Sequence, residues 1–362
     1  ERSKAFQQSK LNNGDAKLEA FFGLSKEVKF CKRCLISNQR PSSSVEFKNK
    51  GQAKITIDFD ENSVCSACKF QDIKDNIVNW KDRENQLKEL CGVYRDKNSR
   101  YDCLVPASGG KDSIYTAHLL KYKYGMSPLT VTWAPHMYTD AGRKNHEKMI
   151  HSGFDNILFT PNGMLHRELT RKAFLNLCHP FQPFIIGQRL IGPKIASMYN
   201  IKLIFYGENQ AEYGNNIKEN DNPEMSTEFI SKEKKDEIII GKEPLDKIIK
   251  DNNFHEKSAE PYTPVSKEEL ISKEIKVHYL SYYTKWDPQE NYYYAVDNCG
   301  FEANDQRTEG TFSRYTSFDD KIDPLHYYTT LIKFGIGRAT YDVAYEIRTK
   351  KLDINEGRML IK

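Results

Sequence analysis

Hydrophobic residues in the middle of the chain form short runs that alternate with longer amphipathic segments. The runs are rich in β-branched and aromatic residues, which is typical of strands buried in a parallel sheet. They predict strands at 101–106, 129–133, 156–160 and 202–206. The amphipathic segments predict helices at 111–124, 143–152, 165–177 and 190–200. Strands that alternate with helices favour an α/β fold with a doubly wound parallel sheet and right-handed crossovers.

The residues outside this pattern separate into regions of different character. A polar extension precedes paired cysteines and a charged helical stretch, in which Ile73, Ile77, Trp80, Leu87 and Leu90 are spaced to share one face. A lysine- and glutamate-rich segment is expected to form either a mobile lid or, more simply, a solvated insertion. The C-terminal region is expected to be mostly helical. These differences divide the chain into 1–29, 30–98, 99–216, 217–275 and 276–362.

Composition narrows the class of protein. Hydrophobic residues make up 38% and charged residues 29% of the 362 residues, which is usual for a soluble enzyme. No run of about 18 apolar residues predicts a membrane span, and residues 1–30 show no secretory segment. Four of the eight cysteines form two close pairs, which favours a metal site in a reducing compartment. We therefore expect a cytoplasmic protein.

A glycine-rich segment follows the first predicted strand and opens the next helix. Its glycines let the backbone approach a ligand closely, and its amides with the helix N-terminus form a cradle for an anion. It is not a Walker A loop, because Asp112 stands where that loop has Ser or Thr. An ordinary turn before a capped helix is the alternative. The candidate phosphate-binding residues are Ser108, Gly109, Gly110, Lys111, Asp112 and Ser113.

The paired cysteines predict a structural zinc site. Two C-x-x-C turns supply four thiolates to a tetrahedral Zn²⁺ and leave no open position for catalysis. A redox dithiol is the alternative, but it would stand at a helix start in a thioredoxin-like βαβ unit, which neither pair does. The candidate metal ligands are Cys31, Cys34, Cys65 and Cys68.

The string Ser108–Ser113 resembles the loop of the ATP-pyrophosphatase superfamily, which has the fold of the adenine nucleotide alpha hydrolases. The resemblance implies that the loop binds the β- and γ-phosphates of ATP, so that an oxygen nucleophile attacks the α-phosphorus and releases pyrophosphate. It also places the adenine and ribose near Thr132, Trp133 and Ala134.

Motifs along nearly the whole chain resemble the N-acetyl sugar amidotransferases. They include Phe30–Leu35, Ile57–Glu61, Cys65–Cys68, Ser108–Ser113, Tyr206–Asn209, Glu212–Gly214, Trp286–Asn291, Gly310–Thr311, Asp319–Asp323 and Lys333–Thr340. Members of that family convert the acetamido group of a bacterial surface sugar to an acetamidino group. The products enter flagellin glycans based on pseudaminic or legionaminic acid, and the O-antigen of lipopolysaccharide.

The resemblance also implies a mechanism and partners. ATP, with Mg²⁺, would adenylate the amide oxygen, and ammonia would then displace AMP. The ammonia would come from a separate glutaminase, similar to the amidotransferase subunit of histidine biosynthesis, together with a cyclase-like subunit. No membrane partner is expected, and a nucleic-acid partner is disfavoured.

Polar residues outside the loop are candidates for the same site. By superfamily resemblance a distal cation reaches the phosphates, and the candidate catalytic cations are Lys333, Arg338 and Lys194, with surface charge as the alternative. Ligands of open α/β sheets bind at the carboxyl ends of strands. The residues that end the fourth predicted strand are Gly207, Glu208 and Asn209.

Two other functions remain open. The ATP-pyrophosphatases that thiolate tRNA also join zinc knuckles to such a loop, but they add a catalytic cysteine pair and a basic surface. Here Cys178 and Cys299 are far apart in sequence and the formal net charge is only +4. The second alternative is a nucleotide-binding scaffold without catalysis, which a test for ATP turnover would distinguish.

Overall fold

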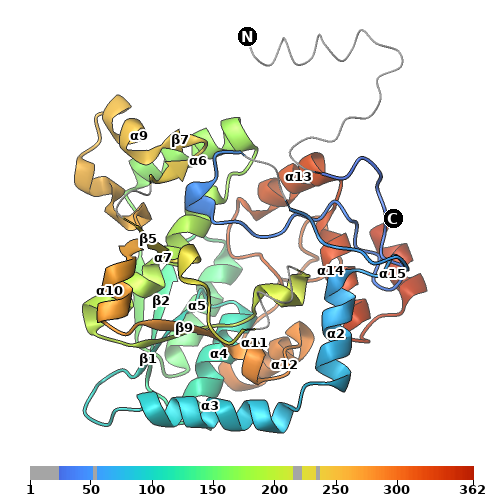
Figure 1. Cartoon of the computed structure of the whole chain (residues 1–362), viewed down its shortest axis with the longest axis horizontal. Helices are drawn as coiled ribbons and strands as arrows, with labels where there is room; N and C mark the ends of the chain where they lie inside the picture. The colour runs from blue at the N-terminus through green and yellow to red at the C-terminus, as the bar shows by residue number, and fades with distance from the viewer. Residues whose placement is uncertain (1–23, 52–54, 215–221, 234–236) are drawn as a thin grey trace.

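The computed structural model describes residues 24–51, 55–214, 222–233 and 237–362. Its centre is a sheet of five parallel strands in the order β3-β2-β1-β4-β9 (Figure 1). The strands are β1 (Cys103–Pro106), β2 (Pro128–Trp133), β3 (Asn156–Phe159), β4 (Leu203–Tyr206) and β9 (Lys276–Tyr279). The predicted strands are all present, with bounds shifted by at most two residues, and the α/β fold is confirmed.

Each face of the sheet is covered by its own hydrophobic core, because successive strand residues point to opposite sides. Along β1, Leu104 joins the core under α6 and α7, whereas Cys103 and Val105 join the core under α3, α4 and α12. The helices that form these layers are α3 (Trp80–Tyr94), α4 (Lys111–His118), α5 (Asp140–His151), α6 (Gly163–Leu177), α7 (Gln182–Tyr199) and α12 (Pro288–Cys299).

The charged stretch after the cysteines is two helices, not one continuous face. Between α2 (Ser66–Asn76) and α3, Ile77 is 75% exposed, while Leu87 is fully buried. The side chain of Asn79 accepts the amides of Lys81 and Asp82, and this cap starts α3. The prediction of one shared apolar face was therefore wrong, because a side-chain cap broke the helical register.

Two helices of the sheet domain also differ from the sequence pattern. The predicted helix 111–124 consists of α4 followed by the π-helical η2 (Leu119–Lys123). Helix α7 begins eight residues before the predicted start of 190–200, with Pro183 in its first turn. Proline is favoured there because the first helical amides need no intrahelical partner.

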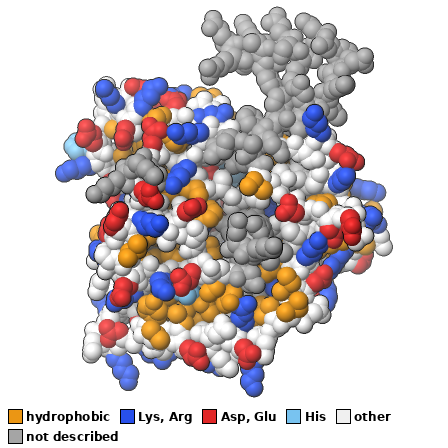
Figure 2. Space-filling model, viewed as in Figure 1, with side chains coloured by type: hydrophobic (Ala, Val, Ile, Leu, Met, Phe, Trp, Pro, Cys, Tyr) orange, Lys and Arg blue, Asp and Glu red, His pale blue; other side chains and the backbone are white. Residues whose placement is uncertain are grey.

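The described part of the segment 217–275 packs on the sheet domain. Ile240, Leu245, Ile248 and Tyr262 are all buried and belong to the same core as α6 and α7. Figure 2 shows charged side chains of both signs on the outside of this corner, at the upper left. The segment is therefore a packed insertion whose polar residues face solvent. Residues 217–221 and 234–236, like 1–23 of the N-terminal extension, lie outside the described residues.

The insertion is built from short elements. They are η4 (Thr227–Phe229), β5 (Ser231–Lys232), β6 (Ile239–Ile240), β7 (Glu243–Pro244), α9 (Leu245–Asp251), η5 (Glu256–Tyr262), β8 (Val265–Ser266) and α10 (Lys267–Ser272). The short helices η1 (Glu46–Lys48) and η3 (Gln210–Tyr213) lie elsewhere in the chain.

The C-terminal region is mostly helical, as expected, but it begins with a strand. Strand β9 pairs with β4 in parallel and completes the central sheet. The helices that follow β9, apart from α12, are α11 (Leu280–Tyr283), α13 (Asp323–Phe334), α14 (Arg338–Arg348) and α15 (Ile354–Ile361). Among the described helices, none combines the length and apolar content needed to cross a bilayer.

Candidate functional site

The glycine-rich loop joins β1 to α4 and lies at the carboxyl edge of the sheet. Gly109 has a φ of +90°, and a Cβ there would lie 2.6 Å from the Cα of His146 in α5. Only glycine fits this close approach. Gly110 caps α4 in an extended conformation, and the Ser113 hydroxyl donates to its carbonyl oxygen at 2.9 Å. The first amides of α4 need no intrahelical partner and can receive an anion.

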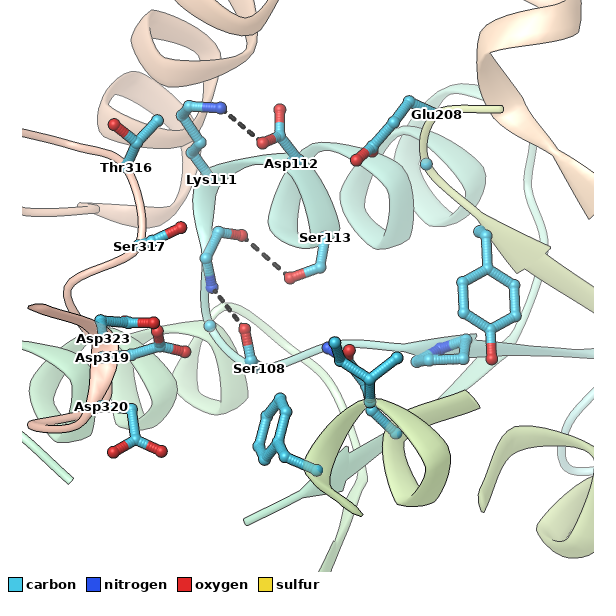
Figure 3. Close-up of a pocket in the computed structure, with 18 of the residues that line it drawn as sticks. Ser108, Lys111, Asp112, Ser113, Glu208, Thr316, Ser317, Asp319, Asp320 and Asp323 are labelled. Carbon is cyan, nitrogen blue, oxygen red and sulfur yellow. Dashed lines mark hydrogen bonds and ion pairs between the residues drawn. The ribbon is translucent and has the colours of Figure 1, made fainter. Parts of the chain in front are cut away.

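The loop faces a cavity of about 570 Å³ (Figure 3). Ser108, Lys111, Asp112 and Ser113 line one side, and Glu208 at the end of β4 lines another. Lys111 pairs with Asp112, which also accepts a hydrogen bond of 2.9 Å from the Asn291 amide in α12. Asp112 is therefore held by two neighbours at the mouth of the loop.

Glu208 lies in a setting that favours its protonated form. Burial, and then the nearby Asp112 carboxylate, raise the pKa of Glu208 above its usual range. Its Oε1 accepts a hydrogen bond of 2.7 Å from the Tyr213 hydroxyl. Gly207 and Asn209 line the same cavity, so these three predicted residues do meet the loop.

The wall opposite the loop comes from residues 315–327 and carries buried carboxylates. The Asp320 carboxylate lies 2.9 Å from His136 Nδ1, at hydrogen-bond distance. It also accepts a hydrogen bond from the backbone amide of Ile322. A Cβ on Gly142 would lie 2.6 Å from the Cα of Asp319, so this segment is pressed against the start of α5. The wall is thus fixed beside the glycine-rich loop.

Asp319 and Asp323 from this wall line the cavity next to Ser108 (Figure 3). Asp323 is 6% exposed, and its Oδ2 has no hydrogen-bond partner among the described residues. Burial, followed by the charges of Asp319 and Asp320, raises the pKa of Asp323 to about 8. Burial also raises the pKa of Asp319. Such carboxyl groups are costly to ionise unless a cation joins them.

Arg338 reaches the same region from the first turn of α14. It is 2% exposed, one of its nitrogens donates to the Thr316 carbonyl, and its Nε and Nη1 have no hydrogen-bond partner in the described part of the chain. With Lys111 and Asp112 it lines an adjoining cavity of about 460 Å³. A buried guanidinium with two unused donors is suited to an anion.

The other two candidate cations do not line either cavity. The Nζ of Lys333 donates to the Leu177 carbonyl of α6 at 3.3 Å, and Lys194 pairs with Glu260 of η5. Burial lowers the pKa of Lys194. Both lysines tie helices together in this structure.

The predicted adenine segment at the end of β2 is buried on its side-chain face. Thr132 donates to the Ala107 carbonyl at 2.5 Å, and the Trp133 ring packs with Phe159 in the core under α7. Neither these two nor Ala134 lines the cavity, so only their backbone could contact a nucleotide. An adenine site at this segment stays a prediction.

The four cysteines form one buried cluster. Their sulfur atoms all lie within 4.8 Å of one another, with 3.8 Å between Cys31 and Cys68 and 3.5 Å between Cys34 and Cys65. A tetrahedral metal about 2.3 Å from each sulfur requires separations of this size. In a 4Fe–4S cluster each thiolate binds a different iron, so the sulfurs would stand farther apart. The cluster therefore fits a single metal ion.

Asp319, Asp323 and Asn291 are not among the predicted site residues, although they belong to motifs that carry the family resemblance. Each stands far from the loop in sequence and reaches it only through the packing of α12 and of the 315–327 segment. Three aspartates within five residues before a helix were a usable signal, since buried carboxylates are rare without a partner.

Comparison with known proteins finds a match to one family model over the C-terminal part. Residues 309–362 match the family described as LPS biosynthesis protein WbpG-like, C-terminal domain. No curated protein matches the chain in sequence. Among solved structures, the chain is similar to the U34-tRNA thiolase NcsA from Methanococcus maripaludis with its 4Fe-4S cluster. The match has 14% identity and a TM-score of 0.30, and it covers 91% of this chain and 88% of that chain. So distant a likeness carries no argument about activity.

Proposed function

We propose that the chain is an ATP-dependent N-acetyl sugar amidotransferase of bacterial surface-polysaccharide synthesis that releases AMP and pyrophosphate. The observation that carries the proposal is the position of Arg338. This residue belongs to the segment that matches the WbpG-like domain, and its guanidinium is buried and partly unpaired among the described residues. Arg338 lines one cavity together with Lys111 of the glycine-rich loop. The loop supports binding of a nucleotide, and the match to the WbpG-like domain supports a role in polysaccharide synthesis. An anion site that both segments line supports the two roles in one chain.

The loop amides and the hydroxyls of Ser108 and Ser113 bind the two distal phosphates of ATP as a unit. Lys111 and Arg338 neutralise the charge that develops on pyrophosphate as it leaves. Donors aimed at developing charge act without reorganisation, which is why they accelerate the step. The α-phosphorus then remains accessible from the open cavity.

The carboxylates beside the loop fit Mg²⁺. Asp319 and Asp323 would repel a triphosphate unless a cation lay between them, and Asp323 has an unused oxygen. Mg²⁺ is commonly held by one or two carboxylates together with substrate phosphates. It would supply charge neutralisation at the phosphates, and these two residues would hold it.

The reaction proceeds in two substitutions. The amide oxygen attacks the α-phosphorus, the bond to the β-phosphate oxygen breaks, and pyrophosphate leaves. Ammonia then attacks the imidate carbon, loses a proton, and AMP departs with the former amide oxygen. We assign that proton to the carboxylate of Glu208, because Glu208 lines the same cavity as the loop, where the amide must react.

The remaining parts of the proposal concern metal, partners and location. The four cysteines hold a structural Zn²⁺, which their sulfur spacing fits. A separate glutaminase with a cyclase-like subunit supplies ammonia, and the protein acts in the cytoplasm. Ammonium salt at high concentration should therefore replace glutamine for the purified chain.

An isotope experiment tests the proposed chemistry. An acetamido sugar labelled with ¹⁸O in its acetyl carbonyl is incubated with ATP, Mg²⁺ and ammonium salt, and the nucleotide products are examined by mass spectrometry. The label should appear in AMP and not in pyrophosphate. ADP as the main product would exclude the pyrophosphatase reaction, and unlabelled AMP would exclude adenylation of the amide oxygen.

A further inference from the structure

One arm of the main cavity is lined by residues that the phosphate chemistry does not use. Arg189 extends from α7, Tyr206 ends β4, Tyr279 ends β9, and Met225 comes from the insertion, just before η4. The Met225 amide donates to the Val277 carbonyl at 2.8 Å, so this segment is fastened to β9. The lining of this arm is therefore held in place by the sheet, and it includes one cation, Arg189.

Arg189 is partly buried and surrounded by uncharged groups. Its Nη1 lies 3.7 Å from the Met225 sulfur, and its guanidinium lies 5.9 Å and 5.6 Å from the ring centres of Tyr206 and Phe229. Within the described ranges, no carboxylate lies within ion-pair distance of Arg189. Other partly buried cations have one, for example Lys172 with Glu243.

A partly desolvated arginine without an acidic partner is suited to an anion that arrives with a ligand. The Tyr279 hydroxyl is a polar neighbour of the guanidinium. The rings of Tyr206 and Tyr279 also offer faces on which the apolar side of a sugar ring can stack. The loop has its own cation, Lys111, and the adjoining cavity has Arg338. Arg189 is thus available to a second anionic group.

We propose that Arg189 binds the anionic group of the sugar substrate. This inference rests on the proposed function and narrows its substrate class to acetamido sugars that carry a negative charge. The anion is either the carboxylate of a sugar acid or the diphosphate of a nucleotide sugar, since a guanidinium binds both through paired hydrogen bonds. Anchoring that group in the arm of Tyr206 and Tyr279 orients the acetamido group toward the phosphate loop.

The test measures binding by calorimetry without ATP, so that it does not depend on turnover. The probes are N-acetylneuraminic acid for the carboxylate, UDP-N-acetylglucosamine for the diphosphate, and N-acetylglucosamine as the neutral sugar. The unaltered protein should bind one anionic probe about 10- to 100-fold more tightly than the neutral sugar. The probe that does so identifies the source of the anion.

Arg189→Gln should remove that preference, and Arg189→Lys should retain part of it, because a lysine keeps the charge but not the paired geometry. Arg167→Gln, on the exposed side of α6, is the matched control and should change nothing. Equal binding of charged and neutral probes by the unaltered protein would overturn the inference. So would an Arg189→Gln variant that keeps the preference, or one whose affinity for ATP falls instead. Absence of AMP formation with intact anion binding would instead count against the proposed function alone.

Discussion

The two walls of the cavity are built in different ways. The glycine-rich loop is a continuous segment, Ser108–Ser113, whose shape follows from one strand, one helix and two glycines. The opposite wall, with Asp319 and Asp323, has no regular strand and is held by contacts to α5 and to His136 after β2. Arg338, in the adjoining cavity, comes from the part of α14 that packs on the cysteine module. The loop should therefore tolerate changes elsewhere in the chain, whereas the wall depends on its supports.

The strongest test of this difference removes the metal site. The Cys34 Sγ lies 3.7 Å from Nη1 of Arg348 in α14, and the buried cysteines share a small core with Ile336 and Ala344. Binding of a structural metal contributes on the order of 10 kcal/mol to folding of small sites. Cys65→Ser should release the metal and loosen α14, while the sheet persists. Metal analysis should find about one zinc per chain in the unaltered protein, and hydrogen exchange should rise in α14 before β1.

A protein that is metal-free yet equally protected in α14 would contradict this dependence. Cys178→Ser is a suitable control, because this cysteine lies outside the cluster. It should leave the metal content and the exchange pattern unchanged.

The second test changes the loop itself and compares the effect of an added side chain on stability at its two glycines. Gly109→Ala places a side chain at a φ of +90° and 2.6 Å from the α5 backbone, which should cost about 2–6 kcal/mol of unfolding free energy. Gly110→Ala should cost far less, because its φ is −74° and the nearest atom to a Cβ is the Ser108 hydroxyl oxygen at 3.4 Å. Urea unfolding measures both. Equal losses would mean that the close approach at Gly109 does not constrain the loop.

These contrasts also explain what could be predicted from the sequence. Strands β1 to β4 and the loop are local patterns, so periodicity and glycine spacing were sufficient. The cysteine cluster was predictable because each C-x-x-C turn is a local pattern, and two such turns can bind one metal ion through four thiolates. Strand β9 was missed because its four residues include Lys276 and His278, and only pairing with β4 makes them a strand.

The candidate cations show the same limit. Arg338 and Lys333 are five residues apart and equally plausible in sequence, yet only Arg338 lines a cavity, because Gly335 ends α13 and turns the chain into α14. Which of them meets the loop depends on the direction of two helices, and no local pattern specifies that direction.

The third test concerns the pH dependence of the wall. Asp323 has a pKa of about 8 in the folded protein and an ordinary value near 4 when unfolded. The folded state therefore holds a proton that the unfolded state loses, so the contribution of Asp323 to the free energy of unfolding is largest below pH 4 and declines as pH rises toward 8. Between pH 5 and pH 8 the loss is up to about 4 kcal/mol, at 1.36 kcal/mol per unit.

Asp323→Asn should remove this decline and be more stable than the unaltered protein at pH 8. Thermal unfolding at pH 5 and pH 8, without nucleotide, measures the difference. A parallel decline in both proteins would show that Asp323 is ionised in the folded state. Added ATP and Mg²⁺ should narrow the gap for the unaltered protein only, since a bound cation stabilises the carboxylate.

The smallest expected effect separates the two C-terminal cations, and it decides whether the wall takes part in the chemistry. Arg338→Gln removes a charge from the adjoining cavity while preserving a polar side chain. Losing one donor to a leaving group typically costs about 3 kcal/mol of transition-state stabilisation, or roughly a hundredfold in rate.

Lys333→Gln is the matched control, because the ammonium group of Lys333 contacts the Leu177 carbonyl of α6 and not the cavity. It should leave the rate of AMP formation within about twofold and lower only stability, by about 1 kcal/mol. The measurement is the initial rate of AMP release at saturating ammonia, with the melting temperature of each variant as a check on folding. If Lys333→Gln lost the rate and Arg338→Gln kept it, the helix α13 would have to turn toward the loop during catalysis, and the wall seen here would be a resting arrangement.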